Sequence, residues 1–129
     1  MEMFAELLGS ARRAREQAYC PYSHFAVGAA LLTSDGEIFA GCNVENLSFG
    51  LTVCAERTAL YSAVSAGKRQ FSGLVLVTDT PEPVTPCGAC RQALYEFSPN
   101  LWIVTANLLG EQRVYRLSEL LPDAFSAKI

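Results

Sequence analysis

The stretch "TPCGACRQAL" places Cys87 and Cys90 three positions apart in a chain of 129 residues with five cysteines. Such a pair can form a disulfide, act as a redox couple or provide two ligands of a metal ion. The sequence shows no signal-peptide pattern of a charged region and an apolar run, so we expect a cytoplasmic protein with reduced thiols. This expectation and the odd number of cysteines favour metal ligation or catalysis over a disulfide.

A third cysteine, Cys54, lies in the stretch "TVCAERTAL". We expect it in the first turn of a helix capped by Thr52, and Thr85 and Pro86 suit the N-cap and first position of a helix that holds the Cys-x-x-Cys pair. A helix N-terminus lowers the pKa of a thiol and so supplies the thiolate that a metal requires. The two helix ends can therefore face one ion. Three protein ligands with one open position are typical of catalytic zinc, whereas four are typical of structural zinc.

Glu56 follows the third cysteine by two positions. Residues i and i+2 of a helix point about 200° apart, so Glu56 and Cys54 can both attend one ion only if it lies beyond the helix end. A carboxylate there is placed to move protons on whatever fills the fourth position. On the residues alone, two alternatives stay open. One is a structural zinc site with Cys20, Cys42 or His24 as fourth ligand, and the other is a thioredoxin-like redox pair.

Apolar periodicity and turn signals predict the elements that position these side chains. We expect a helix over residues 2–18, then a hairpin whose two strands, residues 25–33 and 38–42, are joined by the turn "SDGE". The polar stretch "NVENLSFG" is predicted to be a loop. A helix over residues 52–66 is expected to end at Gly67.

The second half of the chain alternates strands and helices. The predicted elements are a strand at 73–79, a Pro-rich loop, a helix at 86–97, strands at 101–106 and 113–117, and a terminal helical turn in "SELLPDAF". Together with the hairpin this makes five strands. We therefore expect a single domain over residues 1–129 with a three-layer α/β/α fold and a central mixed five-stranded sheet.

The charge balance is mildly acidic, with 10 Lys and Arg against 13 Asp and Glu. This balance gives no reason to expect a nucleic-acid partner, and the apolar runs are too short to cross a membrane. Hydrophobic residues make up 50% of the chain, which is high for a small protein without a membrane segment. This excess indicates buried subunit interfaces.

The motifs "CAERTAL" and "PCGACRQAL" together resemble the zinc signature of the cytidine deaminases, the small homotetrameric class that acts on free nucleosides. The likeness extends to "PYSHFAVGAALL", "GCNVENLSFG" and the closing "LLPDAF". Deaminases of nucleic acids and nucleotides usually have His-x-Glu where this chain has Cys-Ala-Glu. The resemblance implies a cytidine deaminase fold and the hydrolysis of cytidine and 2′-deoxycytidine to uridine and 2′-deoxyuridine, with release of ammonia.

The resemblance also implies how the chemistry is divided among residues. Cys54, Cys87 and Cys90 are expected to bind one Zn²⁺ per subunit. Glu56 is expected to take a proton from the attacking water and to pass protons to N3 of the base and to the departing amine. Arg57 corresponds to an arginine that contacts the ligand sulfurs, where it offsets the net negative charge of three thiolates and one Zn²⁺.

The resemblance places the nucleoside against two other segments. Asn43 and Glu45 match positions that hydrogen-bond the ribose, and Val44 between them is included in the binding segment. Phe25 matches an aromatic residue beside the nucleoside. The backbone of Ala55 is expected to help hold the base.

The closing motif adds a residue from another subunit. Phe125 matches an aromatic residue that reaches into a neighbouring site, so the resemblance implies a homotetramer with shared active sites. Phe49 stands where many relatives have Tyr, so a contact through that hydroxyl is absent here. Cys20 and Cys42 are expected to be small buried or loop thiols, because the family's site is complete without them. His24 is expected to be a surface or loop residue.

Two other functions compete with this interpretation. A blasticidin-type deaminase has a similar zinc motif but lacks the sugar-binding pattern that "NVEN" matches here. A structural zinc protein without turnover would need a fourth protein ligand.

Overall fold

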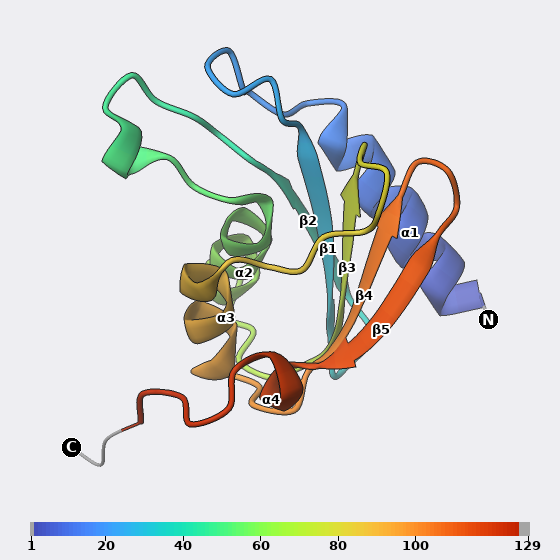
Figure 1. Cartoon of the computed structure of the whole chain (residues 1–129). Coiled ribbons are helices and arrows are strands. Elements are labelled where there is room, and N and C mark those ends of the chain that lie inside the picture. The colour runs from blue at the N-terminus through green and yellow to red at the C-terminus, as the bar shows by residue number, and fades with distance from the viewer. Residues whose placement is uncertain (1, 127–129) are drawn as a thin grey trace.

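Helices cover both faces of a five-stranded sheet in the computed structural model, which describes residues 2–126 (Figure 1). The strands are β1 (Val27–Thr33), β2 (Ile38–Cys42), β3 (Phe71–Thr78), β4 (Trp102–Asn107) and β5 (Gln112–Arg116). The helices are α1 (Glu2–Arg15), α2 (Ala55–Ser65), α3 (Gly88–Tyr95) and α4 (Leu117–Leu120), with a 3-10 helix at Phe49–Leu51.

The strand order is β2-β1-β3-β4-β5, and the sheet is mixed. β1 pairs antiparallel with both β2 and β3, β3 pairs parallel with β4, and β4 pairs antiparallel with β5. The parallel pair is joined through α3, as expected because parallel neighbours need a crossover connection. The predicted hairpin forms, and Gly36 has φ +93° in its turn. The predicted three-layer fold with a mixed five-stranded sheet is therefore confirmed.

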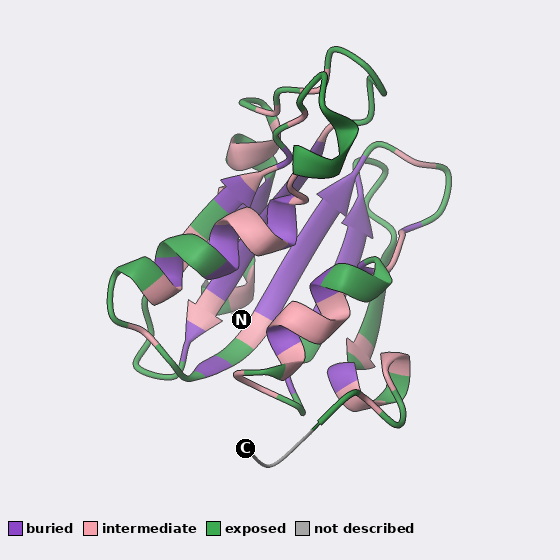
Figure 2. Ribbon diagram, turned by 90° about the vertical axis from the view of Figure 1, so that its left-hand side faces the viewer, coloured by how far each residue is buried: buried purple, intermediate pink, exposed green. Residues whose placement is uncertain are grey.

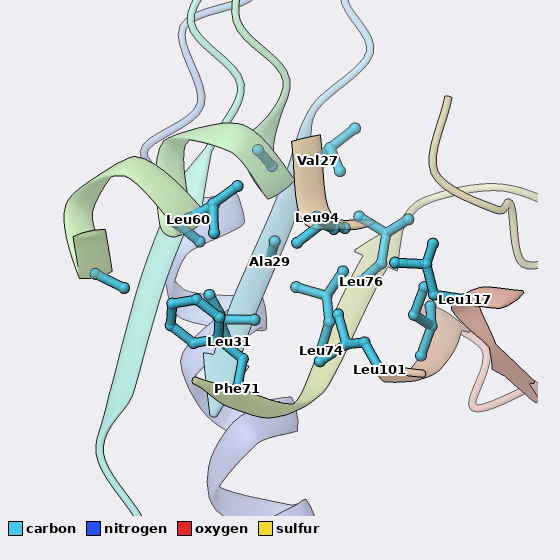
Figure 3. Packing of buried hydrophobic residues seen from close by; sticks show 14 residues of the cluster. Val27, Ala29, Leu31, Leu60, Phe71, Leu74, Leu76, Leu94, Leu101 and Leu117 are labelled. Atoms are coloured by element: carbon cyan, nitrogen blue, oxygen red, sulfur yellow. The ribbon is translucent and has the colours of Figure 1, made fainter. Parts of the chain in front are cut away.

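Two apolar clusters lie on the two faces of the sheet. On one face, Leu7 and Ala11 of α1 pack with Ala30, Val75 and Val77. On the other face, α2 and α3 cover a larger cluster that includes Leu31, Leu60, Leu74, Leu76 and Leu94 (Figure 3). β1 and β3 are buried along most of their length, because helices exclude water from both sides (Figure 2).

The helices differ from their predicted bounds at the ends. α1 ends at Arg15, and the next residues continue only as a turn, with the Gln17 amide bonded to the Ala14 carbonyl at 3.0 Å. α2 ends as predicted before Gly67, whose φ of +91° turns the chain so that the next amide, that of Lys68, bonds the Ala63 carbonyl at 3.0 Å. Among residues 2–126, none of the helices combines the length and the apolar character that a bilayer crossing requires.

Candidate active site

Three cysteine sulfurs meet at the N-termini of α2 and α3. The Sγ atoms of Cys54, Cys87 and Cys90 all lie within 4.8 Å of one another. Cys54 is the N-cap of α2 and Cys87 is the N-cap of α3, while Cys90 lies in the first turn of α3 and is fully buried. The positive ends of both helix dipoles therefore face the sulfurs, which favours thiolates.

The predictions that Thr52 and Thr85 cap these helices are wrong. Cys54 and Cys87 have extended backbones, with ψ of 155° and 167°, and their carbonyls accept the first helical hydrogen bonds. The Thr52 hydroxyl instead accepts a bond from a loop amide at 3.4 Å, and the Thr85 hydroxyl accepts one from the Arg91 guanidinium at 2.8 Å. The proline after Thr85 therefore precedes the helix and does not open it.

The sulfur separations fit a tetrahedral zinc ion. Two sulfurs bound to one zinc at about 2.3 Å in tetrahedral geometry lie about 3.8 Å apart. The Sγ atoms of Cys54 and Cys87 are 3.8 Å apart, and those of Cys87 and Cys90 are 3.6 Å apart. Thiolates are soft ligands that select zinc over magnesium or calcium. The donor set therefore fits Zn²⁺.

The residues considered as a fourth ligand lie away from this group. His24 is exposed, and Cys20 and Cys42 are partly buried. Within the described part of the chain, none of the three joins the sulfur group. The arrangement is thus three protein donors with one position left for a small molecule, as in catalytic zinc sites.

Arg57 stabilises one thiolate of the cluster. Its Nη2 atom donates to the Sγ atom of Cys54 at 3.6 Å. The Cys90 thiol and Arg57 lower the pKa of Cys54 to about 5, whereas the contact with Cys54 and burial raise the pKa of Cys90. Like charges at this spacing oppose each other's ionisation, so a cation is required to hold all three sulfurs as thiolates.

Glu56 is a carboxyl group buried beside the sulfurs. It lies in the first turn of α2, and the residue is 4% exposed. Burial, together with the negative charge of Cys54, raises the pKa of Glu56 to about 7. A carboxyl group that titrates near neutrality can both accept and donate a proton, as general acid–base catalysis requires.

A cavity of about 340 Å³ opens beside the sulfurs and Glu56. This volume lies in the range of small-molecule sites, which combine a hydrophobic wall with a few convergent polar groups. The wall is formed by Ser23, Phe25, Val27, Asn43, Glu45, Thr52, Cys54, Ala55, Glu56, Leu76, Val84, Thr85 and Cys87.

Asn43 holds the segment that carries Phe25. Its Oδ1 atom accepts the Val27 amide N–H at 2.9 Å, and its Nδ2 atom donates to the Phe25 carbonyl at 2.7 Å. The side-chain amide has one further N–H and one further lone pair. Asn43 therefore fixes the backbone of the aromatic residue and keeps a donor for a ligand.

Glu45 is bound to the turn that precedes Phe25. Its Oε1 atom accepts the amide N–H groups of Tyr22 and Ser23 at 3.0 and 3.1 Å, and its Oε2 atom accepts the Ser23 hydroxyl. The Ser23 hydroxyl, followed by these amides, lowers the pKa of Glu45 despite some desolvation. The carboxylate therefore stays ionised at neutral pH.

Four residues predicted for the site lie outside the cavity wall. One is the zinc ligand Cys90, which is fully buried behind the wall. Val44 is 44% exposed, and its backbone pairs with two neighbouring segments. Phe125 is 79% exposed, and its carbonyl accepts a hydrogen bond from the Gln92 side chain at 3.2 Å. Arg57 reaches the sulfur of Cys54 but does not line the cavity.

The wall also contains residues that the sequence reasoning did not assign to a binding site. Leu76 could have been found, because it lies two positions after Leu74 and therefore on the same face of β3, the face that α2 and α3 cover. The others lie in loops or at strand ends, where periodicity carries no signal. They are Ser23, Val27, Thr52, Val84 and Thr85.

A three-layer α/β/α fold with a three-cysteine zinc site and a buried carboxyl group defines a zinc-dependent α/β enzyme. The profile described as "Cytidine and deoxycytidylate deaminase zinc-binding region" matches residues 1–106. Cytidine deaminase of Sporosarcina psychrophila is 51% identical over 122 residues, which is 94% of this chain and 90% of that protein. The chain belongs to the cytidine and deoxycytidylate deaminase family.

The structural comparison agrees. The 1.6 Å crystal structure of cytidine deaminase from Burkholderia pseudomallei has a TM-score of 0.91 and 53% identity, and the match covers 94% of this chain and 98% of that one. Blasticidin-S deaminase of Bacillus cereus is 33% identical over 104 residues, 74% of this chain and 74% of that protein. The likeness to the blasticidin enzyme is thus shorter and weaker.

Proposed function

We propose that this chain is a cytidine deaminase of pyrimidine salvage, which hydrolyses cytidine and 2′-deoxycytidine to uridine and 2′-deoxyuridine and releases ammonia. The observation that carries the proposal is the buried carboxyl group of Glu56 beside three converging cysteine sulfurs at one cavity. Identities of 51% and 53% with proteins named cytidine deaminase support the same substrate class.

The residues that would hold zinc are Cys54, Cys87 and Cys90. Bound there, zinc lowers the pKa of a water molecule and so supplies a nucleophile near neutral pH. The two helix N-termini and the Arg57 guanidinium stabilise the negative charge of the sulfurs. A group of three donors supports this catalytic role over a structural zinc site, which needs four.

Glu56 moves the protons of the reaction. Its carboxylate accepts a proton from the attacking water and delivers it to N3 of the base as the new bond to C4 forms. It then takes the proton of the hydroxyl group at C4 and gives it to the amino group, so that the C4–N bond breaks and ammonia leaves. One water is consumed for each ammonia released. A pKa of about 7 suits a group that serves as base and acid in turn.

The nucleoside is held from the opposite side of the cavity. The Glu45 carboxylate accepts a hydrogen bond from a ribose hydroxyl, and the free N–H of Asn43 donates to the sugar. Val44 keeps these two residues in place through its backbone pairing. Phe25 packs beside the nucleoside, and the backbone of Ala55 helps to hold the base.

The protein is proposed to be a cytoplasmic homotetramer in which each chain forms one domain. Phe125 of each chain reaches into a neighbouring site and covers the base. Large apolar side chains left on the surface support burial between subunits, because solvent contact with such groups is unfavourable. They include Leu47, Phe49, Leu51 and Phe125, which are between 65% and 79% exposed.

The experiment that tests this function combines metal analysis with an ammonia-release assay. The purified protein is expected to contain about one zinc per chain and to release ammonia from cytidine and 2′-deoxycytidine, with little or no release from blasticidin S. Zinc without turnover of any of the three would indicate a structural zinc protein. Preferred turnover of blasticidin S would assign the chain to the other deaminase.

A further inference from the structure

The Ser23 hydroxyl joins two groups at the cavity. It donates a hydrogen bond to Oε2 of Glu45 and accepts the backbone N–H of Phe25 at 3.1 Å. The other oxygen of the same carboxylate accepts the amide N–H groups of Tyr22 and Ser23 at 3.0 and 3.1 Å. Ser23 also lines the cavity. One hydroxyl therefore links the carboxylate to the backbone of the aromatic residue.

We propose that Ser23 is a positioning residue that orients the Glu45 carboxylate toward the sugar hydroxyls of the substrate. The inference rests on the proposed function, in which Glu45 accepts a hydrogen bond from the ribose. A carboxylate offers about four lone-pair directions. Three of them are taken by the turn, so the remaining one is directed by Ser23 toward the cavity.

The turn that carries Ser23 is closed by a backbone hydrogen bond. His24 has φ +59°, in the left-handed region that residues other than glycine rarely adopt. Its amide bonds the Cys20 carbonyl at 3.0 Å, which closes the turn so that the donors of Ser23 face Glu45. The strain at His24 is offset while the carboxylate accepts those donors.

Removal of the hydroxyl has a defined consequence. Oε2 of Glu45 loses its donor, and the amide of Phe25 loses its acceptor. The terminal torsion of a Glu side chain is soft, so the sugar must then order the carboxylate as it binds. Proton transfer at C4 uses Glu56 and not this network. Ser23 therefore affects substrate binding and leaves the chemical step unchanged.

The test measures kcat and KM of Ser23→Ala with cytidine and with 2′,3′-dideoxycytidine, which lacks two sugar hydroxyls. We expect KM for cytidine to rise roughly fivefold to tenfold, the scale of one hydrogen bond, with kcat nearly unchanged. KM for the dideoxy compound is expected to stay close to the wild-type value. Ser23→Thr keeps the hydroxyl and is expected to restore KM for cytidine.

Two further variants separate positioning from general damage. In a Glu45→Ala background, Ser23→Ala is expected to add no further increase in KM, because the group it orients is gone. Ser62→Ala is the matched control, since Ser62 is exposed on α2 away from the cavity wall. Zinc content and Tm are measured for every variant. If Ser23→Ala does not fold, Ser23→Cys, with its weak donor, replaces it in the comparison with Ser23→Thr.

The outcomes distinguish this inference from the proposed function. A wild-type protein that does not deaminate cytidine overturns both. An active wild-type protein whose Ser23→Ala variant keeps its KM, or loses kcat equally on both substrates, overturns the role of Ser23 alone. A rise in KM confined to cytidine, the substrate with the 2′- and 3′-hydroxyls, supports it.

Discussion

The Sγ atom of Cys54 lies 3.8 Å from the Sγ atom of Cys87, which follows it by 33 positions. Each cysteine caps a helix, and α2 and α3 lie on the same face of the sheet (Figure 1). The sulfur cluster is therefore built by the packing of two helices against one apolar cluster. Its chemistry depends on the core as well as on the cysteines.

Loss of any one sulfur of the cluster is expected to cost the zinc. Cys54→Ala, Cys87→Ala and Cys90→Ala each leave two donors, which do not hold the ion under dialysis. The measurement is zinc per chain by elemental analysis after dialysis against a weak chelator.

The remaining candidate donors provide the controls for this experiment. Cys20→Ser, Cys42→Ser and His24→Ala are expected to keep the full zinc content, because none of these residues lies in the sulfur group. Loss of zinc in any of the three would mean a four-ligand structural site and would contradict the proposed enzyme.

Glu56→Gln separates proton transfer from metal binding. The substitution keeps the shape of the side chain and removes the group that accepts protons, so turnover should fall by at least about a hundredfold, the scale of positioned acid–base catalysis. Zinc content and the far-UV circular dichroism spectrum should stay as in the wild type. Zinc lost together with activity would instead identify Glu56 as a ligand or a structural support.

In the metal-free protein, the burial of Glu56 makes stability depend on pH. Its pKa is raised from 4.5 to about 7, so its contribution to stability is fully present below the lower value and is lost as pH rises through the higher one. This difference corresponds to roughly 3 kcal/mol at about pH 8. Glu56→Gln is neutral at every pH, so with chelator present we expect it to be more stable than the wild type at about pH 8.

Urea unfolding of both proteins at two pH values checks this sign. Most of the advantage of Glu56→Gln should be gone at about pH 5, where the wild-type carboxyl group is protonated in the folded state. An advantage of the same size at both pH values would show that packing, and not ionisation, separates the two proteins.

Local sequence patterns predicted the helices and strands, because the apolar pattern of a segment reflects which of its faces are buried in the fold. The continuous apolar runs in "FAVGAALLT" and "GLVLVTD" correspond to β1 and β3, which are covered on both faces. The strand order is a different matter, because the position of β3 between β1 and β4 is set by contacts far apart in the sequence. The 3-10 helix at Phe49–Leu51, inside a predicted loop, also lacks a periodic signal.

The candidate site likewise contains some residues that local sequence patterns predict and others that they do not. Cys54 with Glu56, and Cys87 with Cys90, are recognisable because the short spacing within each of these two pairs is typical of zinc-site chemistry. The caps were misassigned because Thr52 is a better intrinsic cap than cysteine, whereas the convergence of the sulfurs places Cys54 there. The contact between Ser23 and Glu45 joins residues 22 positions apart through an exposed turn, so no local sequence pattern predicts it.

Gly41 allows β2 to approach the helix that carries Cys54. A Cβ atom at Gly41 would lie 2.5 Å from the backbone N of Ala59 and 2.9 Å from the carbonyl O of Ala55. These backbone atoms cannot yield unless α2 moves, so we expect Gly41→Ala to lower the free energy of unfolding by about 1–3 kcal/mol and to weaken zinc binding. The measurements are urea denaturation and zinc titration.

A glycine of β3 provides the matched control. A Cβ atom at Gly73 would meet its nearest atom at 3.8 Å, an ordinary van der Waals distance. Gly73→Ala is therefore expected to change the free energy of unfolding by less than about 0.5 kcal/mol. Equal effects of the two substitutions would contradict a specific role of close packing at Gly41.

Phe125 is exposed on its own chain, as expected of a side chain that a neighbouring subunit covers. Stacking of a base on an aromatic side chain contributes about 1–3 kcal/mol, so Phe125→Ala should lower kcat/KM roughly tenfold or more. Zinc content should not change, because Phe125 lies outside the sulfur group. This loss alone does not show that the residue acts across subunits.

Hybrid oligomers that contain both variant chains test which subunit Phe125 serves. Phe125→Ala protein is mixed with excess Glu56→Gln protein, subunits are exchanged, and native mass spectrometry verifies the hybrids. If Phe125 acts in a neighbouring site, the intact Glu56 of one chain meets the intact Phe125 of another, and activity should rise above the sum of the two parents. If Phe125 serves its own chain, every subunit with Glu56 still lacks it. Verified hybrids without a gain in activity would therefore rule out a shared site.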